Sequence, residues 1–437
     1  MSQPPPHDRA AALSAERGKI EQQATRNNIM KRAPIAIWCT PHAYRSVGRF
    51  GAHHLTSRLA ARGWNVLFLS NPISPLHALR WRHHDARLRW SQALSGMGRE
   101  ADGLCTMLPM TMLPLAAGVG ARSRWILESW PSYTVPNLLR ALRHAGFDHP
   151  DLLVIDGPIG APLVKLLKPR RSVLRLLDRL SGFASTTPAM LAAMAQAAGH
   201  VDLVTYSATD LAGDVDALRP RKKLHLANGV DVDHFAARRA EPATYAPIPR
   251  PRAVYVGALA EWFDFDLVAS AARQRPNISF VMIGPSELAH RRLPGLPNLH
   301  VVGSRPWDLL PAYLQHADVG LIPFDIRNHR ELVNGINPLK LYEYAACGLP
   351  VVSVTWPELQ KLNAPIELAG EADDFVGALD RVLATPPRAD ELKVFAAHHD
   401  WGAMLDRLLS TLGLQGDVRG CRTALPRGTG STVLGPV

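Results

Sequence analysis

The stretch Asn334-Gly-Ile-Asn-Pro-Leu-Lys-Leu-Tyr-Glu-Tyr-Ala-Ala-Cys-Gly-Leu-Pro-Val-Val352 contains a helix with signals at both ends, followed by an apolar strand. Asn337 is a good N-cap residue, Pro338 suits the first helical position, and Gly348 suits the position just beyond the helix. Pro350 then opens the strand. These signals predict a helix of about three turns, because both of its ends are specified.

Two charged residues occupy the start of this helix. Lys340 lies in the first turn, where it adds a full charge to the unpaired N–H groups and the positive end of the helix dipole, so an anionic diphosphate would be stabilised there. Glu343 lies one turn further on, where a carboxylate can accept hydrogen bonds from two neighbouring hydroxyls of a ribose. The alternative is an ordinary surface ion pair, which contributes about 0.5 kcal/mol.

Short apolar runs alternate with amphipathic stretches on both sides of this segment. This alternation predicts α/β architecture with two Rossmann-like, doubly wound parallel sheets facing across a cleft. The expected strands cover residues 34–39, 65–70, 151–156, 172–177, 201–206, 253–257, 278–284, 299–303, 319–323 and 350–354.

The length of 437 residues favours two domains, because a single hydrophobic core stops growing at roughly 250–300 residues. Residues 236–252 contain four prolines, which predicts a stiff, structureless linker. We expect the remaining parts to be a disordered tail over 1–32, a first domain over 33–235, a second over 253–388, a helix over 389–411 that packs back toward the first domain, and a disordered tail over 412–437.

Charge is distributed unevenly between the two halves. Residues 1–240 hold 31 Lys and Arg against 17 Asp and Glu, and the remainder holds 18 against 21. A basic first domain indicates an anionic partner such as phospholipid or a pyrophosphate lipid, although a general bias toward arginine is the alternative. Nucleic acid is not expected, because zinc-finger, RNP and helix-turn-helix signatures are missing from the sequence.

Cysteine usage and the N-terminal residues favour a reducing, cytoplasmic location. The four cysteines are far apart in the sequence, and residues 1–32 lack the apolar core of an export signal. The region 76–127 combines Trp81 and Trp90 with four arginines and then a Met/Leu/Pro run. Proline interrupts that run, which is too short to span a bilayer, so it predicts attachment to a membrane surface; the alternative is an ordinary strand and insertion packed on the core.

Four stretches in the second half and before it resemble bacterial GT-B glycosyltransferases of family 4, also called group 1. The segment quoted above looks like the donor-site helix of that family, and the others are Asn228-Gly-Val-Asp-Val-Asp-His-Phe235, Val254-Tyr-Val-Gly-Ala-Leu-Ala-Glu-Trp-Phe-Asp264 and Ala317-Asp-Val-Gly-Leu-Ile-Pro-Phe324. The first half is more loosely similar to the xanthan glucuronosyltransferase (GumK) type, through Arg49-Phe-Gly-Ala-His-His-Leu-Thr-Ser-Arg-Leu-Ala-Ala-Arg-Gly63.

The resemblance implies that the second domain binds a nucleotide sugar and the first binds the acceptor. It implies that Lys340 contacts the diphosphate, Glu343 the ribose, and the loop Gly303-Ser-Arg305-Pro306 the base, with Gly257 also at the donor site. The family often has a second glutamate eight positions before the ribose glutamate, and this chain has Gly335 there. Asn334 and Asn337 are therefore the substitute candidates for contacts with the donor sugar.

Asp178 is the candidate catalytic base. It follows the strand 172–177 at its carboxyl end, where α/β proteins place their sites, and it resembles the strand-end aspartate that GumK-like enzymes use as general base. Burial would raise its pKa and the neighbouring Arg175 and Arg179 would lower it, so the sequence leaves the direction open. The alternative role is an aspartate that caps a loop. Family 4 relatives mostly retain configuration and GumK inverts it, and Asp178 favours inversion.

His53, Gly51 and Arg49 are the acceptor-side candidates, because they follow the first strand; the alternative for His53 is a surface histidine pair with His54. The sequence also has two D-x-D patterns, Asp231-Val-Asp233 and Asp264-Phe-Asp266. We nevertheless expect no metal and no other cofactor, because in this family a helix end and a lysine neutralise the diphosphate. A UDP-sugar is the expected donor.

The sequence thus predicts a hexosyl- or glucuronosyltransferase at the inner face of the cell membrane. Its acceptor would be a polyprenyl-diphosphate-linked or other lipid-linked glycan, or a polysaccharide, in exopolysaccharide or cell-envelope synthesis. Two alternatives stay open at this stage. One is a nucleotide-sugar epimerase of the same fold, and the other is a degenerate scaffold that binds nucleotide sugar at the membrane without turnover, as the missing second glutamate suggests.

Overall fold

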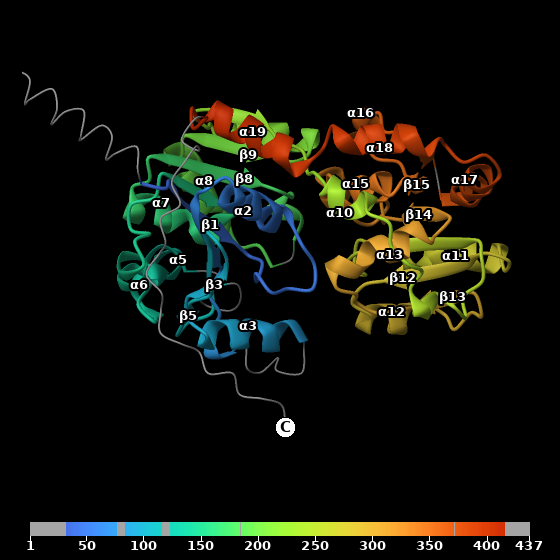
Figure 1. Cartoon of the computed structure of the whole chain (residues 1–437), viewed down its shortest axis with the longest axis horizontal. Coiled ribbons are helices and arrows are strands. Elements are labelled where there is room, and N and C mark those ends of the chain that lie inside the picture. The colour runs from blue at the N-terminus through green and yellow to red at the C-terminus, as the bar shows by residue number, and fades with distance from the viewer. Residues whose placement is uncertain (1–31, 77–83, 116–122, 184, 371, 416–437) are drawn as a thin grey trace, which may run out of the picture.

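The computed structural model describes residues 32–76, 84–115, 123–183, 185–370 and 372–415. In Figure 1 the chain forms two α/β bodies side by side, the first mostly blue to green with the red helix α19 on it, and the second yellow to red. Each body contains a sheet of mainly parallel strands with helices around it. The expectation of two doubly wound domains is confirmed.

The N-terminal sheet has the strand order β10-β9-β8-β7-β1-β2-β4-β3. Its neighbours run parallel, apart from β3, which pairs antiparallel with β4. In this order the strands span Lys223–His225, Leu203–Tyr206, Arg171–Leu176, Leu152–Ile155, Ile35–Thr40, Asn65–Ser70, Leu104–Met107 and Gly98–Ala101. A small separate pair consists of β5 (Met110–Thr111) and β6 (Thr134–Val135).

Helices cover both faces of this sheet, so its central strands are apolar on both sides. On β1, Ile35 and Ile37 face the helices α5, α6, α7 and α8, whereas Ala36 and Trp38 face α2 and α19. These helices, with the more peripheral α3 and α9, span Gly51–Ala61 (α2), His84–Leu94 (α3), Arg124–Ser129 (α5), Leu138–His144 (α6), Ala161–Leu167 (α7), Pro188–His200 (α8), Ala212–Ala217 (α9) and Trp401–Thr411 (α19).

The C-terminal sheet is parallel, with the order β13-β12-β11-β14-β15-β16. Its strands span Leu299–Val301, Ser279–Ile283, Arg252–Val256, Val319–Ile322, Val351–Val354 and Glu367–Ala369 in that order. Its helices are α10 (Val232–Ala236), α11 (Phe265–Gln274), α12 (Glu287–Arg292), α13 (Leu310–Gln315), α14 (Arg330–Asn334), α15 (Leu339–Ala346), α16 (Pro357–Leu362), α17 (Ala372–Ala384) and α18 (Ala389–Ala397).

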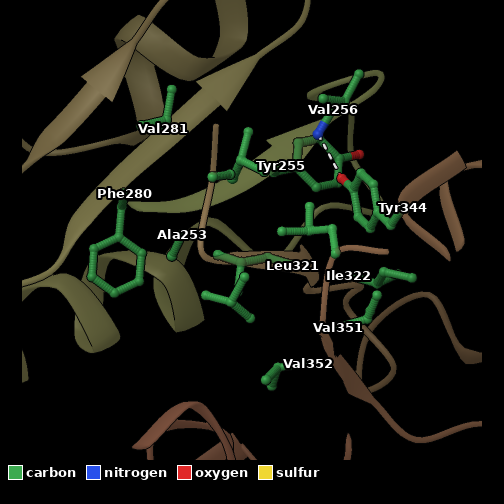
Figure 2. Close-up of a cluster of buried hydrophobic side chains, with 14 of the residues drawn as sticks. Ala253, Tyr255, Val256, Phe280, Val281, Leu321, Ile322, Tyr344, Val351 and Val352 are labelled. Atoms are coloured by element: carbon green, nitrogen blue, oxygen red, sulfur yellow. Dashed lines mark hydrogen bonds between the residues drawn. The ribbon is translucent and has the colours of Figure 1, made fainter. Parts of the chain in front are cut away.

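The helix α15 is seated on the C-terminal sheet by Tyr344. The aromatic ring lies against Gly320 of β14, where an added Cβ would approach the ring to 2.5 Å. The hydroxyl accepts a hydrogen bond of 2.8 Å from the backbone N–H of Val256, the last residue of β11 (Figure 2). Because Tyr344 is completely buried, this contact holds α15 at the carboxyl end of the central strands.

Every predicted strand overlaps an observed one, but the sequence missed β3, β4, β5, β6, β10 and β16. The Met/Leu/Pro run begins with β4, which is buried and pairs with β2, so the alternative of an ordinary core strand is correct for residues 104–107. Trp90 on α3 is half-buried against a small cluster that contains Ile73 and Leu108. Trp81 lies outside the described residues.

Two predicted boundaries are corrected. The 236–252 segment is no free connector, because it contains the short helix η6 (Ala243–Tyr245) and buries Tyr245 and Ile248 in the core of the second domain. The predicted helix 389–411 is two helices: α18 packs in the second domain, and α19 packs on the first. Leu412 and Leu414 are also buried on the first domain, so they are not tail. Residues 1–31 and 416–437 lie outside the described part.

Within the described ranges, the helices are all too short or too polar to cross a bilayer.

Replacing Tyr344 by phenylalanine tests the seating of α15. The variant leaves the buried N–H of Val256 without its acceptor, so we expect a loss of about 1–3 kcal/mol in the free energy of unfolding. Chemical denaturation of the purified protein measures it. Tyr44→Phe, on a half-buried tyrosine of the first domain, is the control and should be close to neutral. Equal stability of the two variants would contradict this role of the hydroxyl.

Candidate functional site

The loops after β11, β12 and β13 meet at one edge of the C-terminal sheet. The N–H of Gly257 donates to the carbonyl of Ile283 at 3.0 Å, and the N–H of Gly284 donates to the carbonyl of Gly303 at 3.2 Å. The predicted base-binding loop 303–306 therefore starts beside Gly257. In that loop the Arg305 guanidinium donates to the Tyr313 hydroxyl at 2.9 Å. Pro306 is exposed and precedes the short helix η7 (Trp307–Leu309).

The helix α15 differs from its prediction at its start. It has eight residues and begins at Leu339 after Pro338, so it is about two turns long instead of three. Asn337 is not its N-cap, since the helix has no side-chain cap. The C-terminal signal is confirmed: Gly348 has φ of 69° just beyond the C-cap Cys347.

Lys340 extends from the first turn of α15 over the edge formed by Gly257. Its ammonium lies 4.5 Å from the ring centroid of Phe324 and 5.0 Å from that of Tyr255. A Cβ at Gly257, which has φ of 146°, would come within 3.1 Å of the Lys340 Cε. Among the described residues, the ammonium makes no ion pair or hydrogen bond, and burial lowers its pKa to about 8. It is thus a cation held by aromatic faces and available to an anion.

Glu343 is half-buried one turn after Lys340. Burial raises its pKa to about 7, while the Lys340 ammonium and the Trp307 indole act in the opposite direction. Trp307 itself bridges the domains: its ring stacks on His234 with the ring centroids 3.5 Å apart, and its backbone N–H donates to the carbonyl of Val47 at 3.2 Å. The predicted diphosphate and ribose residues therefore lie close together at the domain interface.

Both polar atoms of the Asn337 side chain form hydrogen bonds at the domain interface. Its Oδ1 accepts from the N–H of Asn228 at 3.1 Å and from the Tyr342 hydroxyl at 3.0 Å, and its Nδ2 donates to Glu358 at 2.8 Å. Glu358 is completely buried, and its other oxygen accepts from the N–H and hydroxyl of Thr209 at 2.6 and 2.7 Å. Asn337 is thus committed to joining the domains, which contradicts its prediction as a sugar contact.

Asn334 and Gly335 lie at the end of α14, against the first domain. A Cβ on Gly335 would come within 3.1 Å of the Arg179 Cβ and within 3.3 Å of a Leu211 methyl. Asn334 is half-buried, and its role as a sugar contact stays a prediction.

Asp178 lies just after β8, next to this contact between the domains. Neither neighbouring arginine is paired with it: Arg175 pairs with the buried Asp156 at 3.0 Å, and Arg179 pairs with Asp210 and Asp214 at 2.8 Å each. Burial therefore determines the outcome and raises the pKa of Asp178 to about 6. The sequence left the direction of this pKa shift open. The shift is upward because both guanidinium groups bind other carboxylates.

The acceptor-side candidates belong to the start of α2. His53 is buried, its Nδ1 accepts from the N–H of Phe50 at 3.1 Å, and its Nε2 lies 3.2 Å from the carbonyl of Ala43. Burial lowers its pKa to about 4. Gly51 is packed against Trp401 and Arg175, and Arg49 is half-buried over the Tyr44 ring. His53 is therefore a core histidine, so both its acceptor contact and the surface pair with His54 are wrong.

Both D-x-D patterns cap helices. Asp231 accepts from the N–H of His234 at the start of α10, and Asp264 accepts from the N–H of Leu267 at the start of α11. Asp264 and Asp266 also line a cavity of about 470 Å³ in the second domain, which contains none of the predicted site residues. The sequence patterns are thus explained by local helix structure.

Sequence reasoning missed Trp307, Thr209 and Glu358. Trp307 directly follows the predicted base loop, so its position was a usable signal. Thr209 and Glu358 are 149 residues apart in the chain and meet only when the domains dock.

Comparison with known proteins agrees with the division of the chain into two domains. Residues 250–385 match the family model described as glycosyl transferases group 1, and residues 38–207 match the N-terminal domain of glucuronosyltransferase GumK. The putative teichuronic acid biosynthesis glycosyltransferase TuaH of Bacillus subtilis (strain 168) is 28% identical over 234 residues. That alignment covers 49% of this chain and 58% of TuaH.

Solved structures with low sequence identity share the fold. Sucrose-phosphate synthase from Thermosynechococcus elongatus superimposes with a TM-score of 0.62 at 16% identity, covering 87% of this chain and 98% of that one. Anabaena HepE, in complex with UDP and glucose, superimposes with a TM-score of 0.59 at 14% identity, covering 86% and 99%. The fold is GT-B, and the expected combination of a group 1-like C-terminal domain with a GumK-like N-terminal domain is confirmed.

Proposed function

We propose that this chain, which joins a GumK-like N-terminal domain to a group 1-like C-terminal domain in a GT-B fold, is a glycosyltransferase. The donor is a nucleotide diphosphate sugar bound by the second domain, with Lys340 at the diphosphate and Glu343 at the ribose. UDP is the favoured nucleotide, because HepE of the same fold binds UDP and glucose. The transferred sugar is of the hexosyl or glucuronosyl class.

The observation that carries this proposal is the half-buried Lys340 ammonium, which lies over the rings of Tyr255 and Phe324 and makes no ion pair or hydrogen bond within the described residues. The Glu343 carboxylate one turn away acts on it only through its charge, which raises the pKa of Lys340 against the larger effect of burial. A partly desolvated ammonium that contacts no carboxylate directly is costly, and a bound diphosphate reduces that cost. The N–H groups at the start of α15 add donors for the same anion. No metal or cofactor is needed in this proposal, since the leaving diphosphate is neutralised by these groups.

Asp178 acts as the general base in the proposed reaction. Its carboxylate takes the proton of an acceptor hydroxyl while that oxygen forms a bond to the anomeric carbon of the sugar. The bond from the anomeric carbon to the diphosphate breaks on the opposite face, and Lys340 stabilises the negative charge that leaves with the nucleotide. This arrangement inverts the anomeric configuration.

The proposed acceptor is a lipid-linked or polysaccharide glycan at the cytoplasmic face of the cell membrane. TuaH, a relative over part of this chain, is named for teichuronic acid biosynthesis, which supports a cell-envelope glycan. Exposed apolar side chains surround the β5–β6 pair of the first domain: Met112 is 67% exposed, Trp125 is 69% exposed, and Val135 is 55% exposed. Trp125 stacks on Tyr133, next to β6. With the basic charge of this half, these side chains favour contact with an anionic lipid surface.

Lys340→Ala tests donor binding. Losing the ammonium should weaken UDP binding about tenfold or more, because a charge-assisted hydrogen bond contributes roughly 1.5–3 kcal/mol. Since the pKa of Lys340 is about 8, the affinity of the wild type should fall as pH rises through 8, and the variant should lack this dependence. Calorimetric titration with UDP measures both effects. Lys393→Ala, an exposed lysine of the same domain, is the control; equal affinity of the two variants would exclude Lys340 from the site.

Asp178→Asn tests catalysis. We expect turnover to fall at least a hundredfold with UDP affinity unchanged, because general bases typically contribute factors of 10² to 10⁴. In the wild type, kcat should fall as the pH drops below about 6, where the carboxylate becomes protonated. Product analysis with a panel of UDP-sugars and a lipid-linked acceptor measures transfer, and the same donors without acceptor reveal an epimerase. A variant with normal rates would rule out Asp178 as the base.

Membrane contact is tested by flotation with vesicles that contain anionic phospholipid. The wild type should float with the vesicles, and Met112→Ser with Trp125→Ser should reduce the bound fraction several-fold. Val394→Ser, which changes an apolar side chain 58% exposed on the second domain, is the matched control. Equal flotation of both variants would show that the β5–β6 region does not bind the membrane.

A further inference from the structure

The segment that carries Asp178 is held on both sides by the loop after β9 (Leu203–Tyr206) and by the helix α9 that follows this loop. On one side, the Ser207 hydroxyl donates to the carbonyl of Leu177 at 2.6 Å. On the other side, Arg179 donates to Asp210 and Asp214 at 2.8 Å each. Residues 177 and 179 are thus both anchored to residues 207–214, so the backbone on either side of Asp178 has little freedom.

This anchored segment is also bound to the second domain. The remaining Nη1 of Arg179 donates to the carbonyl of Glu331 on α14 at 3.2 Å. Thr209, in the same loop, donates to the buried Glu358 of α16. The guanidinium of Arg179 therefore connects two carboxylates of one domain with a backbone carbonyl of the other, and it does so one residue away from Asp178.

Gly335 provides the surface on which this segment rests. A Cβ added there would lie 3.1 Å from the Arg179 Cβ and 3.3 Å from its backbone nitrogen, which is closer than ordinary packing allows. Gly182 makes a second close contact of this kind between the two domains, because a Cβ added there would lie 3.3 Å from Leu332 of α14. A side chain at 335 would therefore push the Asp178 segment away from the second domain.

We propose that Arg179 is a positioning residue, which holds Asp178 at the domain interface beside the end of α14, and that Gly335 is the docking surface that this position requires. This inference rests on the proposed function. It also accounts for the position of Gly335: Arg179 and Leu211 of the first domain fill the space that a glutamate side chain would need. A carboxylate for the reacting sugar is then supplied from Asp178, across the interface, and not from residue 335.

Arg179→Gln and Arg179→Lys test the positioning role. In Arg179→Gln, kcat should fall at least tenfold while the KM for the donor and the affinity for UDP stay within twofold. Arg179→Lys keeps the positive charge but cannot donate hydrogen bonds to all the partners of the guanidinium, so its kcat should lie between those of the wild type and Arg179→Gln. Arg381→Gln is the matched control, because Arg381 also pairs with two carboxylates, Glu367 and Asp374, but far from the interface. A full kcat in Arg179→Gln would overturn the proposal.

Gly335→Glu distinguishes this proposal from its alternative, because the proposal predicts a lower kcat and the alternative an unchanged or higher one. If the space belongs to the Asp178 segment, the added side chain should lower kcat at least tenfold and leave UDP affinity within twofold. If residue 335 instead lies at an open donor site, the new carboxylate should leave kcat unchanged or raise it, which would contradict the proposal. Gly295→Glu, at an exposed glycine of the same domain with nothing near its added Cβ, controls for the charge.

Failure of this inference is distinguishable from failure of the proposed function. A wild-type protein that binds no nucleotide and transfers no sugar would overturn both the function and the catalytic meaning of Arg179. A wild type that transfers sugar, together with fully active Arg179→Gln and Gly335→Glu, would overturn only the positioning role. Small-angle scattering on Gly335→Glu adds a reading independent of activity, since displacement of the segment should increase the separation of the domains relative to Gly295→Glu.

Discussion

A buried carboxylate, that of Glu358, determines how the two domains meet. It is completely buried, and its hydrogen bonds come from Asn337 and, across the interface, from Thr209. In the docked state the carboxylate is shielded from water, so one of its oxygens depends on the two donors of Thr209; losing those donors while the domains stay docked would leave a buried charge unsatisfied, which is costly. The same network includes Asn228 through Asn337, so the start of α15 and the first domain are held in one arrangement. The site described above exists only in that arrangement.

Burial at this interface also determines the protonation behaviour of the site. It lowers the pKa of Lys340 to about 8 and raises those of Glu343 and Asp178 to about 7 and 6. In each case the largest cause is the loss of water around the charged form. The arginines that would oppose this effect at Asp178 are engaged elsewhere, since Arg175 and Arg179 bind other carboxylates. A base with a pKa near 6 is ionised at neutral pH and still accepts a proton readily.

The sequence predicted those parts of the site whose signals are local. Lys340 and Glu343 lie one turn apart on one helix, and Gly348 ends that helix with a positive φ as expected. The errors share one cause. Asn337 is of a residue type that favours N-caps, but its side chain binds the other domain; His53 is of a residue type that is often exposed, but it is buried. For Asn337 the partner lies 109 residues away in the chain, and for His53 the packing of the folded domain, with hydrogen bonds to Phe50 and Ala43, removed the side chain from solvent. Helix end signals carry no information about either environment.

The sequence by itself determined the fold class, the two sheets and the helix that bears the donor-binding candidates, because alternation of apolar residues and helix end signals act over a few neighbouring residues. Only the tertiary structure decided which polar groups meet across the domains: Thr209 with Glu358, Arg179 with the carbonyl of Glu331, and Gly335 with the segment of Asp178. These contacts join residues more than a hundred positions apart, and they exist only where the surfaces of the two folded domains meet and exclude water.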